Sequence, residues 1–268
     1  MQISQLRNLT DRNVIITGAS SGIGSKVAYQ LAKKGANLDL IARRVDNLTS
    51  VEQKCKALGA HSVSIHSLDV SNAKDVEATV EQIISKDGHI DILINAAGFG
   101  DFSKFENTNY SLWTKMFKVN VLGTMLMCRL IAANMIDNDL GQIINIGSMG
   151  GKIATPKSTI YSASKAAVIA FSNSLRLELR PLNIQVTTIN PGPVKTDFFK
   201  IADHTGTYIQ SVGKIMLDPT KLAKEIVNCI GRPVRELNRP RIMELGHIAY
   251  ELMPWLGDLI TESVGNLK

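Results

Sequence analysis

Short apolar segments alternate with longer amphipathic segments along most of the chain. We expect strands at 13–17, 36–42, 61–66, 90–95, 142–148 and 183–190. Apolar positions at helical spacing predict helices at 23–34, 45–58, 72–86, 109–136 and 158–180. Strands and helices in this alternation are typical of a parallel sheet with helices on both faces. Because crossovers are right-handed and no linker or repeat interrupts the pattern, we predict one α/β domain over 1–268 with a doubly wound, Rossmann-type sheet.

The pattern loosens after Pro191, where aromatic and glycine residues follow without clear periodicity. We interpret 197–217 as a substrate lid. A helix is expected at 218–230, then a short strand near 234–239 and a tail, 240–268, that opens with a helix near 241–253. This helix carries one apolar stripe, made of Ile242, Leu245, Ile248, Ala249 and Leu252. We expect the tail helix to pack against protein, at a pocket mouth or on a partner subunit.

Composition narrows the possible classes of protein. The chain is 44% hydrophobic and 20% charged, which is ordinary for a soluble protein. Its net charge of +6 suits an anionic cofactor, and no block of like charges suggests a nucleic-acid partner. We expect no secretory signal and no apolar run of the roughly 18–20 residues that a membrane span needs, so membrane association is not expected.

The chain has three cysteines that lie far apart in the sequence: Cys55, Cys128 and Cys229. They predict free buried thiols, no metal site and a cytoplasmic location.

A glycine turn, TGASSGIG (17–24), joins the first predicted strand to the first predicted helix. Gly18 would permit the tight turn, Gly22 would let the backbone approach a pyrophosphate, and Gly24 would let helix and strand pack closely. The N-terminus of the helix would offer free N–H groups to phosphate. The alternative is a tight connection that binds no ligand. The turn predicts cofactor contacts by Gly18, Ser20, Ser21, Gly22, Ile23 and Gly24.

The end of the second predicted strand bears on which dinucleotide is bound. An acidic residue here usually holds a free ribose 2′-hydroxyl, but the chain has Ala42 followed by Arg43 and Arg44. Asp39 lies inside the strand, too early to reach the ribose. Because a guanidinium suits a 2′-phosphate, we predict NADP rather than NAD, with Arg43 as the favoured ligand. The alternative is that one or both arginines are only solvated residues at a helix start.

The segment YSASK places Tyr161 and Lys165 four residues apart on one face of a predicted helix. An ammonium beside the phenol would lower its pKa and suit it to general acid–base catalysis. Such a pair is common by chance, so its weight comes from its surroundings. Other predicted strands end at Ser148, at Asn95 and at NPGPVKT (190–196). Ligands bind at the carboxyl ends of parallel strands, so these groups should share one rim.

Taken together, these segments resemble the short-chain dehydrogenase/reductase family over residues 11 to about 235. The motifs that carry the resemblance are TGASSGIG, LDV (68–70), NAAG (95–98), Asn120 of KVN, Ser148, YSASK and PGPVKT (191–196). The chain departs from many members at its end, where a strand, Pro240 and an amphipathic helix replace an Asp-Gly-Gly ending. The departure leaves the substrate and the quaternary structure open.

The resemblance implies a role for each matching residue. Tyr161 would be the catalytic acid/base, Lys165 would hold the nicotinamide ribose, and Ser148 would orient the carbonyl. Asn120 would hold a water that links Lys165 to solvent. The remaining implied cofactor contacts are Asp69 and Val70 at the adenine, Asn95 at the adenosine ribose, and Pro191, Gly192, Val194 and Thr196 around the nicotinamide. A homodimer or homotetramer is also implied.

These inferences predict an NADP-dependent oxidoreductase that interconverts a carbonyl and a secondary alcohol. One alternative is a dinucleotide-binding sensor or scaffold without catalysis, which would not need Ser148. Another is a 3-oxoacyl thioester reductase, which the missing Asp-Gly-Gly ending makes less favoured. An apolar small-molecule substrate is predicted by the expected pocket wall of Phe99, Phe102, Met149, Phe198 and Phe199.

Overall fold

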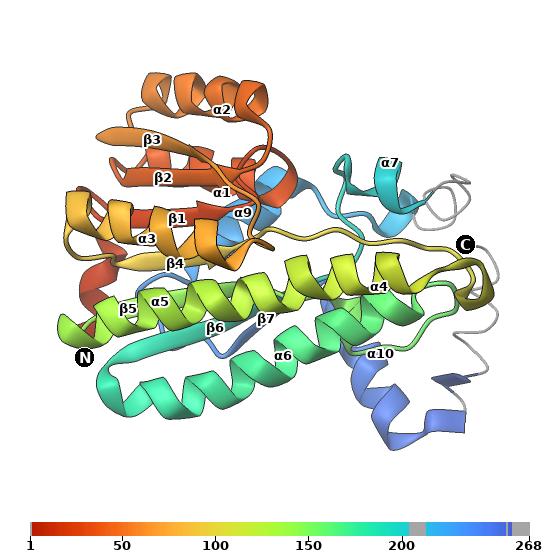
Figure 1. Cartoon of the computed structure of the whole chain (residues 1–268). Helices are drawn as coiled ribbons and strands as arrows, with labels where there is room; N and C mark the ends of the chain where they lie inside the picture. The colour runs from red at the N-terminus through yellow and green to blue at the C-terminus, as the bar shows by residue number, and fades with distance from the viewer. Residues whose placement is uncertain (1, 204–212, 256, 259–268) are drawn as a thin grey trace.

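A computed structural model describes residues 2–203, 213–255 and 257–258 of the chain. In these residues, parallel strands form one seven-stranded sheet in the order β3-β2-β1-β4-β5-β6-β7 (Figure 1). The strands are β1 (Asn13–Thr17), β2 (Asn37–Ala42), β3 (Ser62–Ser67), β4 (Ile92–Asn95), β5 (Gly141–Ile146), β6 (Ile184–Pro191) and β7 (Glu236–Arg239). The predicted parallel α/β sheet is therefore confirmed, with strand ends shifted by one or two residues.

Helices cover both faces of the sheet. They are α1 (Gly22–Ala32), α2 (Val45–Ala57), α3 (Ala73–Asp87), α4 (Tyr110–Phe117), α5 (Thr124–Asp137), α6 (Thr159–Leu179), α7 (Phe198–Ala202), α9 (Pro219–Asn228) and α10 (Arg241–Leu252). One core contains buried residues of α1, α2 and α9, and the other contains those of α3, α5 and α6. Along β1, Val14 and Ile16 join the first core while Ile15 joins the second, as alternating side chains of a strand must.

The strand order reverses at β1, which pairs with β2 on one side and with β4 on the other. At such a switch point the connections leave in opposite directions, so a crevice opens beyond the carboxyl ends of the strands. The turn after β1 and the segment after β4 meet there. A Cβ added to Gly18 would lie 2.6 Å from the carbonyl oxygen of Ala96. This close approach explains why glycine is required at residue 18.

The predicted helix at 109–136 is interrupted in the structure. A π-helical segment, Lys118–Gly123, separates α4 from α5. Within it, the carbonyl of Asn120 accepts a hydrogen bond from the Thr124 hydroxyl, at 2.9 Å. π-Helical turns inside α-helices are often found at functional sites, and their extra residue is invisible to a pattern of period 3.6. The sequence pattern therefore predicted the helical run but missed the irregular turn at Asn120.

The same run also corrects our expectation about apolar length. The helical stretch Tyr110–Asp137, 28 residues long, has the length and composition of a membrane-crossing helix, with a mean hydropathy of 1.6 in its most apolar window. More than half of that window, 56%, is buried inside the protein. Met127, Cys128 and Ile131 belong to the core against the sheet. A buried core helix passes the same test, so length and composition alone carry little weight here.

The tail helix α10 does not bury the apolar stripe that the sequence predicted. Ile242, Leu245 and Leu252 of the predicted stripe are 67–77% exposed, and α10 contributes no buried side chain. Met243 and Glu244 of α10 contact the rest of the described chain instead, and Met243 lines a cavity described below. The described residues of this chain do not cover the stripe, and its packing on a partner subunit stays a prediction. Of the predicted lid, 204–212 lie outside the described residues.

Candidate active site

A cavity of about 460 Å³ lies at the carboxyl ends of the strands. It collects most of the side chains that the sequence singled out. The predicted site residues that line it are Gly18, Ser20, Ser21, Gly22, Ile23, Arg43, Arg44, Asp69, Val70, Ser148, Tyr161, Lys165, Pro191, Gly192, Val194 and Thr196. These residues come from segments far apart in the sequence, because parallel strands bring their carboxyl ends to one edge.

The glycine turn forms one end of the cavity. Gly18 has a φ of 66°, a left-handed conformation that favours glycine. A Cβ added to Gly24 would lie 2.5 Å from the carbonyl oxygen of Gly18, so Gly24 lets α1 pack against the turn rather than lining the cavity. Ser21, the residue before α1, makes no side-chain cap among the described residues. The first N–H groups of α1 are thus left for an anion at the cavity wall.

Two arginines stand beside this turn. Nη2 of Arg44 donates to the hydroxyls of Ser20 and Ser21, at 3.3 Å and 2.9 Å. Arg43 is 61% exposed, and its nearest acidic atom is Oδ2 of Asp69, at 3.7 Å. Arg43 and a hydrogen bond from Ser71 help hold the pKa of Asp69 below its usual value, against the opposing effect of burial. The cavity therefore presents two guanidinium groups at the end of β2.

Asp39 cannot serve as a ribose ligand. It is buried in β2, and its Oδ1 lies 2.8 Å from Nε2 of His66 and 3.9 Å from Nζ of Lys86. Asp39 is not among the residues that line the cavity. The structure thus agrees with the expectation that the acid lies too early in the strand to reach the ribose.

The structure does not bring Asn95 to the cavity. Its side chain is buried, and Nδ2 donates to Oδ1 of Asn145 at 2.9 Å and to Sγ of Cys128 at 3.3 Å. Asn95 ends β4 with its side chain toward α5, and the next three residues, 96–98, line the cavity instead. The side chain of Asn95 thus points away from the cavity, and its predicted place near the adenosine ribose stays a prediction. The position at a strand end did not show to which face the side chain points.

Asn120 lies just behind the cavity wall, on the π-helical segment. Its side chain accepts from the N–H of Phe99 at 3.0 Å and donates to the carbonyl of Phe99 at 2.9 Å. A Cβ added to Gly98 would lie 3.1 Å from Oδ1 of Asn120 and 3.5 Å from Nζ of Lys165. Asn120 thus clamps the segment after β4 next to Lys165, although it does not itself line the cavity.

Ser148, Tyr161 and Lys165 gather at the middle of the cavity. Ser148 follows β5 by two residues; its Oγ accepts from the N–H of Gly150 at 3.0 Å and hydrogen-bonds to Tyr161. Tyr161 and Lys165 are both on α6, one turn apart, and Nζ of Lys165 lies 6.0 Å from the centre of the Tyr161 ring. Nζ also donates to the carbonyl of Ile146 at 2.8 Å. The spacing predicted from YSASK is confirmed.

The electrostatics at this point differ from the expectation. Burial raises the pKa of Tyr161 to about 12, although the hydrogen bond from Ser148 acts to lower it. Burial also lowers the pKa of Lys165 to about 8, because no carboxylate compensates its charge. The predicted lowering of the tyrosine pKa by Lys165 is therefore not found. At Tyr161, desolvation outweighs the hydrogen bond with Ser148, and at neutral pH the phenol holds its proton.

Aromatic rings cover the side of the cavity next to Tyr161. The ring centres of Phe102 and Phe198 lie 5.8 Å and 5.6 Å from that of Tyr161, and Phe199 packs against Phe198 at 5.4 Å. Phe99 and Met149 also line the cavity, as the sequence predicted. Sequence reasoning missed further apolar residues of the lining, among them Ile153, Ile201 and Met243. Ile153 lies in a loop, Ile201 in the short helix α7 and Met243 in α10, where no periodic pattern assigns a side chain to a site.

All three cysteines are free and buried, as predicted. Burial raises the pKa of Cys55 and that of Cys128 to about 12, so both thiols stay protonated at neutral pH. None of the three lines the cavity. The cysteines therefore fill space and play no part in the site's chemistry.

Comparison with known proteins agrees with this geometry. Residues 12–205 match the family model for short chain dehydrogenase. The chain is 36% identical over 260 residues to the "11-beta-hydroxysteroid dehydrogenase-like 3" protein of Arabidopsis thaliana, covering 94% of this chain and 80% of that protein.

Two solved structures share the fold. One is a metagenomic short-chain oxidoreductase in complex with NADP, 28% identical, with a TM-score of 0.74 over 86% of this chain and 97% of that one. The other is an alcohol dehydrogenase of the archaeon Thermococcus sibiricus complexed with 5-hydroxy-NADP, 27% identical, with a TM-score of 0.75 over 85% and 95%. With the glycine turn, the serine and the tyrosine–lysine pair at one rim, the chain belongs to the short-chain dehydrogenase family of oxidoreductases.

Proposed function

We propose that this protein is an NADP-dependent oxidoreductase that interconverts a carbonyl and a secondary alcohol, with Tyr161 as the acid/base. The observation that carries the proposal is the meeting of Ser148, Tyr161 and Lys165 at one point of a cavity whose other end is the glycine turn. A dinucleotide-binding sensor would need the turn and α1 but not the hydrogen-bonded serine and tyrosine. An oxidoreductase would use the residues at both ends of the cavity: the glycine turn for the cofactor, and the serine, tyrosine and lysine for the reaction.

The residues present fit a nicotinamide dinucleotide. Gly22, Ile23 and the uncapped start of α1 would take the pyrophosphate, and the segment from Pro191 to Thr196 would hold the nicotinamide. Asp69 and Val70 would lie at the adenine. When bound, the cofactor supplies the hydride that is exchanged with the carbonyl carbon. The protein's own residues orient the substrate and move the proton.

The proton is held by Tyr161 at neutral pH. With a pKa raised to about 12, its phenol is protonated at neutral pH and would be the group that donates a proton to a carbonyl oxygen during reduction. Ser148 lies within hydrogen-bonding distance of the same phenol, so one carbonyl oxygen would meet both hydroxyls. Lys165, buried behind Tyr161, would bind the nicotinamide ribose, and Asn120 would hold the water that connects Lys165 to solvent.

The preference for NADP is supported by the end of β2. Two guanidinium groups, Arg43 and Arg44, line the cavity there, and Ala42 stands where an acid would hold a free 2′-hydroxyl. Two structural relatives were solved with NADP or 5-hydroxy-NADP. We assign the 2′-phosphate to Arg43, because its guanidinium is exposed and only loosely paired, while Arg44 is already bonded to the turn serines.

The substrate is proposed to be apolar. The rings of Phe102, Phe198 and Phe199 form the wall beside Tyr161, and Met243 and Ile201 also line the cavity. An apolar wall favours a ligand that gives up little hydration when it binds. The named relative of Arabidopsis thaliana places steroid-like ketones among the first compounds to test.

A homodimer or homotetramer is also proposed. Leu122 and Leu177 are 56% and 62% exposed, on the helices that cover the α5–α6 side of the sheet. Exposed leucines on helices beside the core are the kind of surface that a second subunit covers. Sedimentation analysis of the purified protein, compared with a Leu177→Lys variant, tests this; a monomer at micromolar concentration would contradict it.

The decisive experiment is a screen of NADPH oxidation with aldehydes, ketones, steroids and 3-oxoacyl thioesters. We expect turnover with at least one apolar ketone, faster with NADPH than with NADH, and none with the matched variant Tyr161→Phe. NADPH binding without turnover of any compound, in either direction, would favour the sensor. A strong preference for thioesters would favour the acyl reductase.

A further inference from the structure

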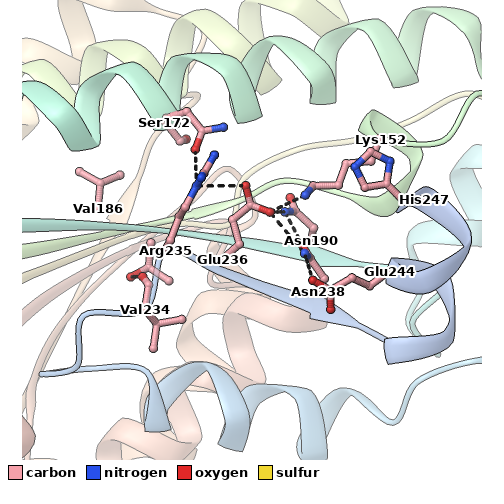
Figure 2. A network of polar contacts seen from close by, with 12 residues as sticks. Lys152, Ser172, Val186, Asn190, Val234, Arg235, Glu236, Asn238, Glu244 and His247 are labelled. Carbon is pink, nitrogen blue, oxygen red and sulfur yellow. Dashed lines mark hydrogen bonds and ion pairs between the residues drawn. The ribbon is translucent and has the colours of Figure 1, made fainter. Parts of the chain in front are cut away.

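A buried ion pair lies beside the cavity, at the start of β7. Glu236, the first residue of β7, pairs with Lys152, which follows the short helix Met149–Gly151. Their side chains are only 15% and 12% exposed. Figure 2 shows the two side chains pointing toward one another from separate segments. Removing two charges from water is costly, so a pair at this depth contributes little net stability and is retained for another reason.

Two asparagines extend the pair into a network. Asn190 of β6 donates to Oδ1 of Asn238 at 2.8 Å, and the two residues are register partners in the sheet. Nδ2 of Asn238 in turn contacts two carboxylates, Oε2 of Glu236 at 3.3 Å and Oε1 of Glu244 at 2.9 Å (Figure 2). Glu244 lies in the first turn of α10. The carboxylate of Glu236 is thus linked through one amide to the tail helix.

Both ends of this network adjoin residues that line the cavity. Lys152 lies between Gly150 and Ile153, which line it on the side of Ser148. Glu244 follows Met243, which lines the cavity next to Gly192: a Cβ on Gly192 would lie 2.5 Å from Sδ of Met243. The network therefore joins two walls that meet across the catalytic centre, the segment 149–155 and the start of α10.

Among the described residues, few other polar contacts hold α10 in place: His247 is only 15% exposed, but its ion pair is with Glu251 of the same helix. It contributes no buried side chain, and its apolar stripe faces away from the rest of the described chain. Figure 1 shows α10 beyond the end of β7, far from α1, α2 and α3. A helix that lacks a buried apolar face depends on its polar contacts for its position. The amide bridge of Asn238 is such a contact, and Glu236 orients that amide.

We propose that Glu236 is a positioning residue that fixes the segment 149–155 and helix α10 relative to each other, and so sets the shape of the substrate cavity. Its effect on catalysis rests on the proposed function, whereas its effect on the two walls does not. Glu236 touches neither cofactor nor reacting atoms. It acts through Lys152 on one wall and through Asn238 on the other.

Hydrogen–deuterium exchange of the full chain, measured by mass spectrometry, tests the positioning directly. In Glu236→Gln we expect amide exchange to become at least tenfold faster in peptides covering both 149–157 and 241–252, with no change in 73–87. Asp91→Asn is the matched control. It breaks another buried ion pair, with Arg12 at 2.8 Å, at the opposite end of the strands. Its exchange in 149–157 and 241–252 should match that of the wild type.

A double variant separates positioning from stability. Lys152→Met alone leaves the largely buried carboxylate of Glu236 with only the looser, more exposed Arg235, whose Nε lies 3.8 Å from Oε1, so it should melt at a lower temperature than the wild type. Lys152→Met combined with Glu236→Gln removes both charges and should regain most of that loss. Exchange in the two walls should nevertheless stay fast in the double variant, because the links to Asn238 and to the segment 149–155 remain altered.

Kinetics with any ketone found in the screen supply the second measurement. We expect Glu236→Gln to raise KM for a bulky ketone at least fivefold, to change kcat less, and to leave the NADPH dissociation constant within twofold of the wild type. Glu236→Asp, which keeps the charge, should recover part of the loss.

Faster exchange in only one wall, or in neither, would overturn the proposal, as would equal KM values in Glu236→Gln and Asp91→Asn. If the wild type turned over no carbonyl, the proposed function would fail while the exchange experiment would still decide on the positioning.

Discussion

Lys165 and Lys152 are two lysines at the same rim that are held in different ways. Lys165 is buried and the side chain of Lys152 is 12% exposed. Lys152 is paired with the carboxylate of Glu236, whereas the one acceptor of Lys165 among the described residues is a backbone carbonyl. Burial without a counter-charge lowers the pKa of Lys165 to about 8. A buried lysine paired with a carboxylate, such as Lys152, holds two segments together. A buried lysine without such a partner, such as Lys165, can bind a ligand or release its proton.

Tyr161, the partner of Lys165, gives the largest expected effect. Tyr161→Phe keeps the ring packed against Phe102 and Phe198 and removes only the transferable proton. We expect kcat to fall roughly 100-fold or more, the scale of general acid catalysis. NADPH affinity, measured by fluorescence titration, should stay near that of the wild type. A kcat close to the wild-type value would remove Tyr161 from the mechanism.

Lys165→Met removes the buried lysine that has no counter-charge, so its effect on stability should be opposite to that of Lys152→Met. The folded pKa of about 8 lies below the ordinary 10.5, so the protonated lysine destabilises the free protein fully below pH 8, and this cost disappears as the pH rises toward 10.5. The variant should therefore be more stable than the wild type at pH 7, by at most roughly 3 kcal/mol, and equally stable near pH 10.5. Thermal unfolding at both pH values measures this.

The same variant should lose function. Cofactor affinity and turnover should both fall, since Lys165 is assigned to the ribose and to the proton relay. Lys152→Met is the matched control on the compensated side, where stability should fall instead of rising. Lower stability of Lys165→Met at neutral pH, or unchanged NADPH affinity, would contradict the assignment.

Arg43 extends the comparison to a loosely paired cation at the surface. Arg43→Ala should weaken NADPH binding by about 1–3 kcal/mol, the scale of charge-assisted hydrogen bonds, and leave NADH nearly unaffected. Arg44→Ala is its control, because Arg44 is bonded to Ser20 and Ser21 of the turn, and its loss should weaken both cofactors alike. Equal losses for NADPH and NADH in Arg43→Ala would refute the 2′-phosphate contact.

The smallest expected effect is an acid dependence of the compensated pair. Lys152 and Asn238 hold the pKa of Glu236 below its ordinary 4.5, in spite of burial. Its contribution to stability is therefore complete above pH 4.5 and is lost as the pH falls through the lower folded pKa. The difference in melting temperature between wild type and Glu236→Gln should shrink over that range.

Glu52→Gln is a suitable control for this acid dependence. Glu52 pairs with Lys56 on the outer side of α2, where an ion pair contributes little. Its melting temperature should stay close to that of the wild type at every pH. A constant gap for Glu236→Gln throughout the acid range would show that the charge of Glu236 does not matter.

The elements and the cofactor end of the site were predictable from the sequence because the interactions are local. Gly18 needs its left-handed turn within one connection, and Tyr161 and Lys165 share a face through helix geometry alone. Alternation of apolar strands and amphipathic helices was enough to predict the parallel sheet, since each element must bury one face. Residues at the carboxyl ends of the strands then belong to one rim, because parallel strands all end at the same edge of the sheet.

Other features were decided only by tertiary packing. Asn95 lies at the carboxyl end of its strand like the other rim residues, but its side chain points to the α5 side and bonds with Asn145. Burial of Tyr161 and Lys165, which no spacing reveals, reverses the expected direction of the tyrosine pKa. These outcomes depend on which face a side chain takes and on how much water remains around it.

The tail shows the same division. Its sequence determined a helix with an apolar stripe, because helical periodicity is a local property. Tertiary structure decided that the stripe stays exposed, while Met243 and Glu244 turn toward the cavity and the network around Glu236. Glu236, Asn238 and Glu244 are ordinary polar residues in the sequence. Glu236 meets Lys152, and Asn238 joins Glu236 to Glu244, because β7 pairs beside β6, a long-range contact that no local pattern encodes.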